Sequence, residues 1–335
     1  MEACIRFLSH LGFKDSHGMR GLNNYNLSCC VNTLLQTFSA TLELANLLDK
    51  WDTASMRSDS GNVPLQLKKV LVAMRSDHPL PAPHRDFLHC LDRNRIQLSI
   101  QHDADEVFHS ILDLMQKQMD NKTLALQIKD LYKISVQTQL KCINCDSVQT
   151  LDSYLISLPL HIKEDQNTLG DCMRSFFEHQ ELRGRDCCTC EQCGTKTPSK
   201  QGVKLLALPP ILCVHLKRFR NIRGYTRKLN CEVIFPQTLN LSEMLREAFS
   251  ADFAQNNCKY TLYAVVVHSG DAMCGHYTAY VRHSRSWYYA DDSCVEKTSW
   301  QDVERTYGGH GRRTAYMLMY RRDSKEEGPQ PECSG

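Results

Sequence analysis

The amino-acid sequence predicts an α+β protein, with a mainly helical first part and a strand-rich second part. Apolar residues recur at helical spacing up to about residue 130, and short β-prone runs follow from about residue 131. Neither an internal repeat nor a low-complexity linker divides the 335 residues, so we expect one composite unit.

Three segments of the first part have the apolar spacing of amphipathic helices. Residues 32–48 carry apolar side chains at intervals of three and four, and residues 64–75 and 103–120 show the same period. These three segments are therefore predicted to be helices.

The second part contains short runs of β-branched and aromatic residues. Some alternate between apolar and polar side chains, as half-buried strands do. The predicted strands span residues 134–140, 203–208, 211–214, 260–268, 276–281 and 315–320.

The composition excludes two classes of partner. The 40 basic and 38 acidic side chains leave a net charge of +2, which provides no global attraction to nucleic acid. No apolar run approaches the roughly 18 residues that a membrane-spanning helix needs. We therefore expect no nucleic-acid partner and no membrane insertion.

The chain contains 17 cysteines, an odd number that cannot pair completely within one chain. The first ten residues carry an acid and an arginine where a secretory signal would have a basic flank and a longer apolar stretch. Without an oxidising compartment, we expect these cysteines to be thiols, metal ligands or a nucleophile.

Two Cys-x-x-Cys knuckles, separated by 44 residues, are formed by Cys142, Cys145, Cys190 and Cys193. Four thiolates match the ligand set of a tetrahedral Zn²⁺ site, and such a site is structural because no coordination position stays open. Cys187 and Cys190 have the same spacing, but Gly194 suits the turn that follows Cys193. We therefore favour Cys190 and Cys193.

A cysteine pair, Cys29 and Cys30, lies where a polar loop runs into the first predicted helix. The positive end of a helix dipole and free backbone N–H groups lower the pKa of a thiol there. Asn24, five residues before Cys29, is placed to face a developing oxyanion. This pattern alone is also that of a buried structural cysteine, and it does not choose between the two thiols.

A second run adds a base and an acid to this candidate site. Two predicted strands flank a glycine-containing loop, which places His276 at a strand mouth with Gly275 beside it. Asp291 follows at the end of a further strand, where it can orient the imidazole. Nucleophile, base and orienting acid then occur in the order Cys, His, Asp.

Residues 21–36 resemble the cysteine box of the ubiquitin-specific proteases, and residues 260–292 resemble their histidine box. Residues 101–106, 208–219 and 233–236 follow the family's order between the two boxes, as do both cysteine knuckles. The resemblance covers about residues 21–320. It implies a papain-like fold with a thumb, a palm and zinc-bearing fingers.

The resemblance also implies boundaries within a single catalytic domain. The thumb would span about residues 21–130, the fingers about 131–205 and the palm about 206–320. The two ends, residues 1–20 and 321–335, are predicted to be loosely held, and the second to be disordered because it lacks apolar periodicity.

Carried over by position, the resemblance makes Cys29 the nucleophile, His276 the base and Asp291 the orienting acid. Asn24 matches the asparagine of the oxyanion hole, and Asp292 matches a second acid that supports the site. Cys30 is the rival nucleophile, and because consecutive helical residues point about 100° apart, only one thiol can face the histidine. The residues assigned to substrate binding are Gln101, Asp103, Asp105, Glu106, His109 and Gly275.

The cysteine box departs from the family's usual Gly-Asn-Thr-Cys-Tyr, which is here Asn26-Leu-Ser-Cys-Cys30. Asparagine tolerates unusual dihedral angles better than most residues, so the turn can survive without glycine. Cys30 in the place of tyrosine resembles the interferon-induced branch, whose members remove a tandem ubiquitin-like modifier.

The function implied is a cysteine isopeptidase that removes the tandem modifier from substrate lysines and restrains type I interferon signalling. Modifier-selective members of this branch have apolar thumb residues at the positions of Asp105 and His109, so strict selectivity is in doubt. One alternative is a deubiquitinase that acts mainly or also on ubiquitin. The other is a non-catalytic scaffold.

The implied partners are the tandem modifier and its conjugates, with ubiquitin, an interferon receptor and an associated transcription factor left open. The implied location is the cytoplasm, with the nucleus left open. Zn²⁺ is the cofactor expected, in a structural role, and none is expected for catalysis.

Overall fold

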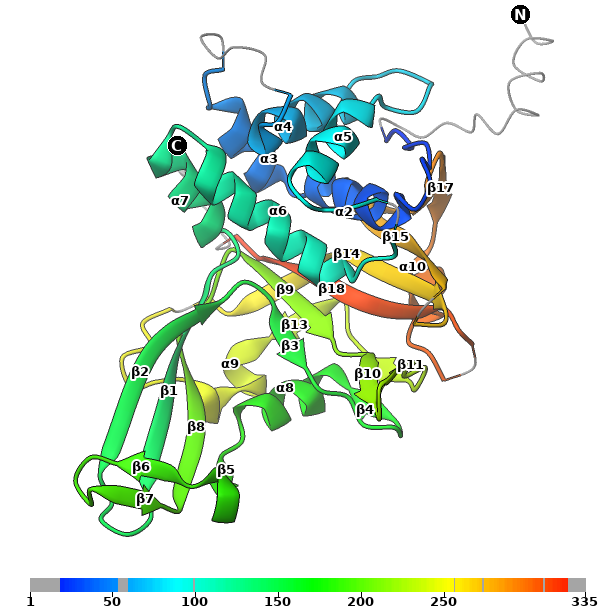
Figure 1. Cartoon of the computed structure of the whole chain (residues 1–335). Helices are drawn as coiled ribbons and strands as arrows, with labels where there is room; N and C mark the ends of the chain where they lie inside the picture. Colours follow the sequence, from blue (N-terminus) through cyan, green and yellow to red (C-terminus); the bar gives the residue numbers. More distant parts are fainter. Residues whose placement is uncertain are drawn as a thin grey trace, which may run out of the picture.

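The computed structural model describes residues 19–53, 60–98, 100–255, 257–272, 274–309 and 311–324. In this part of the chain, helices cover one face of an eight-stranded sheet, and a four-stranded sheet extends away from it (Figure 1). Helices dominate up to residue 130 and strands dominate afterwards. The predicted α+β class is therefore confirmed.

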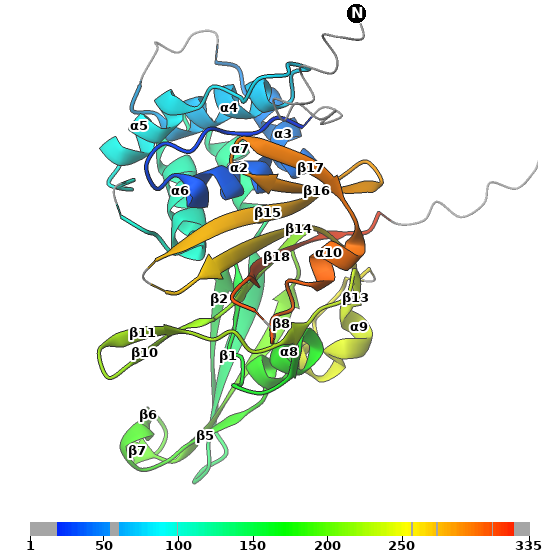
Figure 2. The same cartoon turned by 90° about the vertical axis from the view of Figure 1, so that its right-hand side faces the viewer.

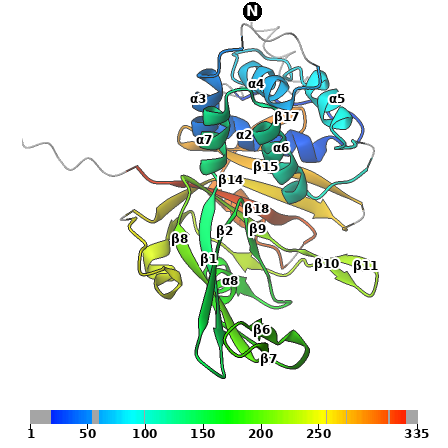
Figure 3. The ribbon, with the colours of Figure 1, turned by 60° about the vertical axis from the view of Figure 1, so that its left-hand side comes forward.

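The helices of the thumb lie together above the large sheet (Figures 1 and 3). Among them, α2 packs directly across strands β14, β15 and β16. Their bounds are α2 (Cys29–Ala40), α3 (Leu42–Asp49), α4 (Val63–Met74), α5 (Arg85–Arg93), α6 (Ala104–Gln118) and α7 (Lys122–Asp130).

The predicted single helix over residues 32–48 is wrong, because the chain breaks at Thr41 into α2 and α3. The Thr41 hydroxyl lies 2.9 Å from the carbonyl oxygen of Thr37 and 2.7 Å from the hydroxyl of buried Tyr263. A threonine hydroxyl that bonds the carbonyl four residues back competes with regular helix geometry. Helical periodicity does not reveal such a break, because apolar spacing continues through it.

The predictions for α4 and α6 are confirmed to within two residues at each end. Each helix has a side chain that caps its N-terminus. Asn62 accepts a hydrogen bond from the backbone of Leu65 at 2.9 Å, and Asp103 accepts one from Asp105 at 2.8 Å. Such caps satisfy backbone donors that the first turn leaves free.

The eight-stranded sheet forms the centre of the molecule. Its order is β17-β16-β15-β14-β18-β9-β3, with β13 paired to β14, and every pairing is antiparallel except β3 with β9. The bounds are β3 (Leu158–Leu160), β9 (Ile211–Leu216), β13 (Thr238–Asn240), β14 (Lys259–Gly270), β15 (Gly275–His283), β16 (Ser286–Asp291), β17 (Cys294–Thr298) and β18 (Thr314–Arg322).

Both faces of this sheet are buried. Along β14, Ala264 and Val266 join the apolar cluster under the helices, whereas Val265 and Val267 join a second cluster on the opposite face. Successive side chains of a strand point to opposite faces, so a strand buried on both has a continuous apolar run. The sheet thereby holds the start of β15 and the end of β16 rigidly beside α2.

The fingers form a four-stranded sheet of order β2-β1-β8-β5. A small hairpin, β6–β7, lies at its far end, and a separate hairpin, β10–β11, projects near the large sheet (Figure 2). The bounds are β1 (Ile134–Cys142), β2 (Val148–Leu155), β5 (Gln180–Leu182), β6 (Cys188–Cys190), β7 (Thr195–Thr197), β8 (Ser199–Ala207), β10 (Phe219–Ile222) and β11 (Tyr225–Lys228).

Shorter elements complete the described chain. They are β4 (Asn167–Thr168), α8 (Leu169–Phe177), η1 (Gly184–Asp186), β12 (Val233–Ile234), α9 (Leu241–Met244), η2 (Arg246–Ala248) and α10 (Trp300–Glu304). Of the predicted loose ends, residues 1–18 and 325–335 lie outside the described residues, and residues 321–322 continue strand β18. None of the described helices is both long and apolar enough to span a bilayer.

Candidate active site

Cys29 is the first residue of α2 and follows a polar loop that passes close to the turn between β16 and β17. The backbone N–H of Leu22 donates to the carbonyl oxygen of Asp292 at 2.8 Å. A Cβ at Gly21 would lie 2.2 Å from the carbonyl oxygen of Ser293, so only glycine permits this approach. The loop therefore brings the helix start to the edge of the large sheet.

Within this loop, Asn26 has the positive φ of 62° that the family's glycine would adopt without strain. Asparagine is among the residues that most often occupy this left-handed region. The turn before Cys29 is thus retained, as the sequence predicted for this departure.

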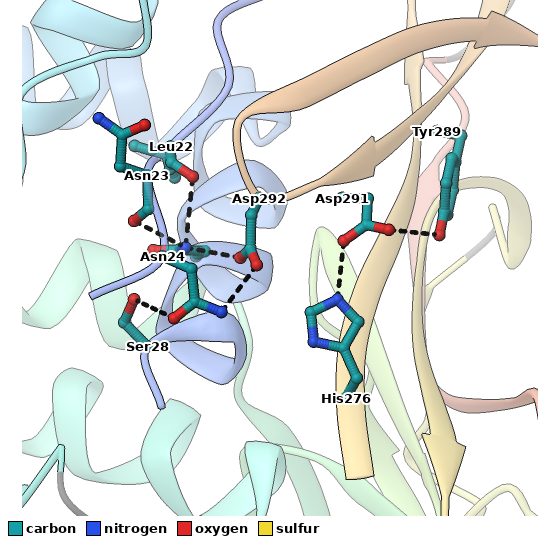
Figure 4. A network of polar contacts seen from close by, with 9 residues as sticks. Leu22, Asn23, Asn24, Ser28, His276, Tyr289, Asp291 and Asp292 are labelled. Carbon is teal, nitrogen blue, oxygen red and sulfur yellow. Dashed lines mark hydrogen bonds and ion pairs between the residues drawn. The ribbon is translucent and has the colours of Figure 1, made fainter. Parts of the chain in front are cut away.

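His276 and Asp291 come from neighbouring antiparallel strands, at the start of β15 and the end of β16. The Nε2 atom of His276 lies 2.7 Å from Oδ1 of Asp291. The Tyr289 hydroxyl donates to the other carboxylate oxygen at 3.2 Å (Figure 4). This arrangement fixes the ring and leaves Nδ1 for a second partner.

The ring of His276 also interacts with the thiol of Cys29, at the start of α2. Hydrogen bonds with Asp291 and then with Cys29 raise the pKa of His276 to about 10, against the opposing effect of burial. The hydrogen bond with His276 also lowers the pKa of Asp291. At neutral pH the imidazole is therefore protonated, and it lies between a carboxylate and the side chain of Cys29.

Cys30 is buried in the apolar cluster under the helices. Burial raises the pKa of its thiol well above the ordinary value, so this side chain stays protonated. The contact with His276 is made by Cys29.

Asp292 is oriented toward the loop before α2 (Figure 4), and one of its carboxylate oxygens also lies within 4.8 Å of a ring nitrogen of His276. Its Oδ2 accepts a hydrogen bond from Nδ2 of Asn24 at 2.8 Å, and its Oδ1 accepts one from Nδ2 of Asn32 at 2.7 Å. Ser28 donates to Oδ1 of Asn24 at 3.4 Å. The carboxylate thus holds the Asn24 amide beside the start of α2.

Sequence analysis did not assign Asn32 to the site. It is a buried polar residue on the amphipathic helix α2, one turn after Cys29. A polar side chain on the buried face of such a helix needs a hydrogen-bond partner. The position of an asparagine among the apolar residues of this helix was therefore the sequence feature that could have indicated its role.

Gln101 lies beside the loop that carries His276. Its Oε1 accepts a hydrogen bond from the backbone of Gly275 at 3.0 Å, and its Nε2 lies 3.4 Å from Nε2 of His268. A Cβ at Gly275 would meet that histidine nitrogen at 2.2 Å and the carbonyl oxygen of Ser269 at 2.6 Å. The strand start before His276 is therefore tightly packed.

Two acidic residues assigned to substrate binding differ in their availability. Asp103 caps α6 with one oxygen and accepts a hydrogen bond from the Tyr316 hydroxyl with the other. Glu106 is exposed on the first turn of the same helix. Glu106 is thus the freer of the two to meet a cationic group.

Asp105 and His109 line a groove of about 710 Å³ between α6 and the fingers. Asp105 is paired with Nδ1 of His215 at 3.1 Å, and that contact lowers the pKa of the carboxyl against the cost of burial. His109 lies 2.8 Å from the hydroxyl of Ser157. This thumb–finger groove is accordingly polar at these two positions.

The four cysteines of the two knuckles lie together at the far end of the fingers. Their sulfur atoms are all within 4.8 Å of one another, and two pairs approach to 3.9 Å and 3.6 Å. Gly194 has a positive φ of 66°, as a tight turn after the second knuckle requires. The group has the composition and spacing for a tetrahedral metal ion, and it contains Cys142, Cys145, Cys190 and Cys193 without Cys187.

Comparisons with known proteins agree over nearly the whole described chain. The family model described as "Ubiquitin carboxyl-terminal hydrolase" matches residues 20–320. "Ubl carboxyl-terminal hydrolase 18" of Homo sapiens is 33% identical over 318 residues, which cover 91% of this chain and 85% of the human protein. The Mus musculus protein of that name is 35% identical over 316 residues, which cover 91% and 86%.

A more distant relative matches only part of its own length. "Ubiquitin carboxyl-terminal hydrolase 47" of Drosophila melanogaster is 24% identical over 385 residues, which cover 91% of this chain and 25% of the fly protein. The residues that the family model matches, 20–320, include Cys29, His276 and Asp291.

Proposed function

The chain belongs to the ubiquitin carboxyl-terminal hydrolase family, and we propose that it is an isopeptidase that removes the interferon-induced tandem ubiquitin-like modifier from substrate lysines. It is a hydrolase of the cysteine-protease type that acts on ubiquitin-like modifiers. As a member of this family, the chain has the papain-like arrangement of thumb, palm and fingers.

The observation that carries the proposal is the contact of His276 with both Asp291 and Cys29. It brings together a thiol at a helix start, an imidazole and a carboxylate. In such a group the imidazole holds the proton that a leaving amine requires.

In the proposed reaction, the Cys29 thiolate attacks the carbonyl carbon of the modifier's C-terminal glycine. The Asn24 amide and backbone N–H groups stabilise the oxyanion of the tetrahedral intermediate. Protonated His276 gives its proton to the leaving lysine amine, and a thioester remains. His276 then takes a proton from water as the water oxygen attacks the thioester, and the modifier's carboxylate leaves with the Cys29 thiolate and the protonated ring restored.

We propose Zn²⁺ as the ion of the four-cysteine group. Thiolate ligands in a tetrahedral set are typical of structural zinc, and four protein ligands leave no position for substrate. The site lies in the fingers, apart from Cys29, so the metal would stabilise the fold and take no part in the reaction.

A specific observation also favours activity on ubiquitin. The thumb–finger groove presents the Asp105–His215 pair and the His109–Ser157 contact. An apolar patch on a partner would strip water from these polar groups without replacing their hydrogen bonds. We therefore expect preference for the tandem modifier with measurable hydrolysis of ubiquitin conjugates.

We further propose that removal of the modifier restrains type I interferon signalling, in the cytoplasm. This rests on the resemblance of the cysteine box to the interferon-induced branch, through Cys30. If signalling is suppressed equally by Cys29→Ala, the restraint comes from binding and not from hydrolysis.

The test compares hydrolysis of fluorogenic C-terminal conjugates of the tandem modifier and of ubiquitin by the wild type, Cys29→Ala and Cys30→Ala. Wild type should hydrolyse both and favour the tandem modifier. Cys29→Ala should lose all measurable activity, because no other thiol contacts His276 among the described residues.

Cys30→Ala is the matched control, because it removes a neighbouring thiol that does not contact His276. It should keep activity within about threefold, since a small cavity near the site changes packing and not the nucleophile. Loss of activity in Cys30→Ala with retention in Cys29→Ala would move the nucleophile. A large preference for ubiquitin would reject the tandem modifier as the main substrate.

A further inference from the structure

A buried histidine of the thumb, His84, is connected to the candidate active site by a single asparagine. We propose that His84 and Asn32 form a relay that positions the carboxylate of Asp292, and through it the Asn24 amide, for stabilisation of the oxyanion. This inference rests on the proposed function, because it assigns positioning residues to that reaction.

Asn32 faces oxygen atoms with its amide nitrogen. Nδ2 lies 2.7 Å from Oδ1 of Asp292 and 3.2 Å from the carbonyl oxygen of Asn23. Since both neighbours accept hydrogen bonds, the nitrogen end of the amide must point toward Asp292. The side chain is only 3% exposed, so water does not compete for these contacts.

The other end of the same amide faces His84. Oδ1 of Asn32 lies 2.9 Å from Nε2 of the ring, and because an amide oxygen only accepts, Nε2 carries the proton. Nδ1 of the same ring lies 3.3 Å from the carbonyl oxygen of Ala82, so both ring nitrogens face acceptors. Burial lowers the pKa of His84, and the neutral ring donates from Nε2, which makes the shorter of the two contacts. His84 precedes α5, and its side chain caps no backbone group of that helix.

Asp292 therefore has a hydrogen-bond donor on each carboxylate oxygen, Asn32 on one and Asn24 on the other. Its backbone is also held, with a φ of 48° and a carbonyl oxygen bonded to Leu22. The amide nitrogen of Asn24 carries two protons. One makes the hydrogen bond to Asp292, and the other remains to donate to the oxyanion. The direction of that second proton depends on where Asp292 is held.

The relay joins three parts of the thumb and palm that are distant in sequence. His84 comes from the residue before α5, Asn32 from α2, and Asp292 from the turn after β16. Figure 4 shows Asp292 aimed at Asn24 while its neighbour Asp291 is aimed at His276. Each aspartate thus serves a different part of the reaction.

The experiment measures kcat and KM for a fluorogenic modifier conjugate with two substitutions at one position. His84→Phe keeps a ring beside Tyr25, whose centroid is 5.4 Å away, but removes the donor to Asn32. His84→Gln keeps a donor near the place of Nε2 and removes the ring. We expect kcat to fall about tenfold in His84→Phe while KM stays unchanged. This loss is smaller than the roughly 10²–10³-fold loss of kcat that is typical when an oxyanion donor itself is removed. His84→Gln should restore most of kcat.

The same substitution is then placed in an Asn24→Ala background. If His84 acts through Asn24, His84→Phe should lower kcat less than about twofold in the Asn24→Ala background. The reason is that the effects of residues that act as a unit are not additive. Asn32→Ser, which interrupts the relay at its middle, should behave in the same way in both backgrounds. His89→Phe, at an exposed histidine of α5, is the matched control and should leave kcat unchanged.

Melting temperatures of all variants separate folding from positioning. The relay would be overturned by any of three results. These are an equal loss of kcat in both backgrounds, a rise of KM alone, and an unchanged kcat in both His84→Phe and Asn32→Ser. If His84→Phe does not fold, Asn32→Ser in the two backgrounds decides alone. A wild type that hydrolyses no modifier conjugate would reject the proposed function instead, so the two failures are distinguishable.

Discussion

Asp291 and Asp292 are adjacent in the chain, yet each holds a different partner. Asp291 ends strand β16 and bonds the ring of His276, whereas Asp292 lies in the following turn and bonds Asn24. The positive φ of Asp292 marks the change of backbone direction between them. The end of strand β16 and the turn after it thus supply two acidic side chains with separate roles.

The raised pKa of His276 predicts the pH range in which the enzyme works. The protonated ring, which supplies the proton for the leaving amine, persists up to its pKa of about 10. The fall of kcat/KM on the alkaline side should therefore lie near pH 10. The protonated ring also contributes to the free energy of unfolding in the same pH range. This contribution is complete below the ordinary pKa of 6.5 and is lost as the pH rises through about 10.

Asp291→Asn tests this cause. Asparagine removes the negative charge and with it the main reason for the raised pKa, so the alkaline limb of kcat/KM should move toward pH 6.5. At pH 8, kcat should fall by on the order of 10². Asp113→Asn, at an exposed carboxylate of α6, is the control. An alkaline limb that stays in place in Asp291→Asn would show that Asp291 does not hold the proton on His276.

At the scale of elements, the site depends on close contact between one helix and the ends of two strands. Helix α2 packs across β14, β15 and β16, so Cys29 cannot move relative to His276 without disturbing the core. Two glycines permit the closest approaches, Gly21 beside Ser293 and Gly275 beside Ser269. Gly21 determines how near the loop before α2 comes to the turn after β16, and Gly275 determines how near the start of β15 comes to β14.

Gly275→Ala should displace the start of β15. The new Cβ would lie 2.6 Å from a backbone oxygen and 2.2 Å from a ring nitrogen of buried His268, and neither can withdraw freely. We expect a loss of about 1–3 kcal/mol in the free energy of unfolding. A roughly 10²-fold loss in kcat/KM should accompany it, as a displacement of about 1 Å can produce.

Thermal unfolding and steady-state kinetics measure the two effects. The matched control is Gly311→Ala, because a Cβ there has no neighbour within 4 Å. Gly275→Ala with the melting temperature and kcat/KM of the wild type would contradict the packing argument.

At the scale of the whole molecule, the two sheets are stabilised in different ways. The large sheet is buried on both faces by two apolar clusters. Along β2 of the fingers, by contrast, six of eight residues are exposed, so little apolar burial holds the far end of that sheet. The four-cysteine group lies beside this strand, with Cys142 at the end of β1 and Cys145 in the turn that leads to β2.

Metal removal should therefore loosen the fingers before the rest of the molecule. After treatment with a strong chelator and verified loss of zinc, residues 131–205 should show faster hydrogen exchange and earlier proteolysis, because metal binding contributes directly to folding there. The metal content should fall from one ion per chain to none. Unchanged exchange after verified removal would contradict a structural role.

Cysteine variants identify the ligands. Cys190→Ser should reduce metal content and reproduce the loosening of the fingers. Cys187→Ser should do neither, since Cys187 lies outside the group. The opposite result would favour the alternative knuckle formed by Cys187 and Cys190.

The α+β class, the helices α4 and α6 and the protease family followed from spacing and residue order, because apolar period, caps and boxed motifs are properties of short stretches of chain. The break at Thr41 did not follow, since apolar spacing continues through it and the Thr41 hydroxyl contacts Tyr263, more than 200 residues away. The resemblance assigned the role of nucleophile to Cys29, with Cys30 as the rival, but the spacing of residues alone did not show which thiol meets His276. His84, Asn32 and Asp292 come together only because α2, α5 and the large sheet pack against one another, and hydrogen bonds between distant segments leave no period in the sequence.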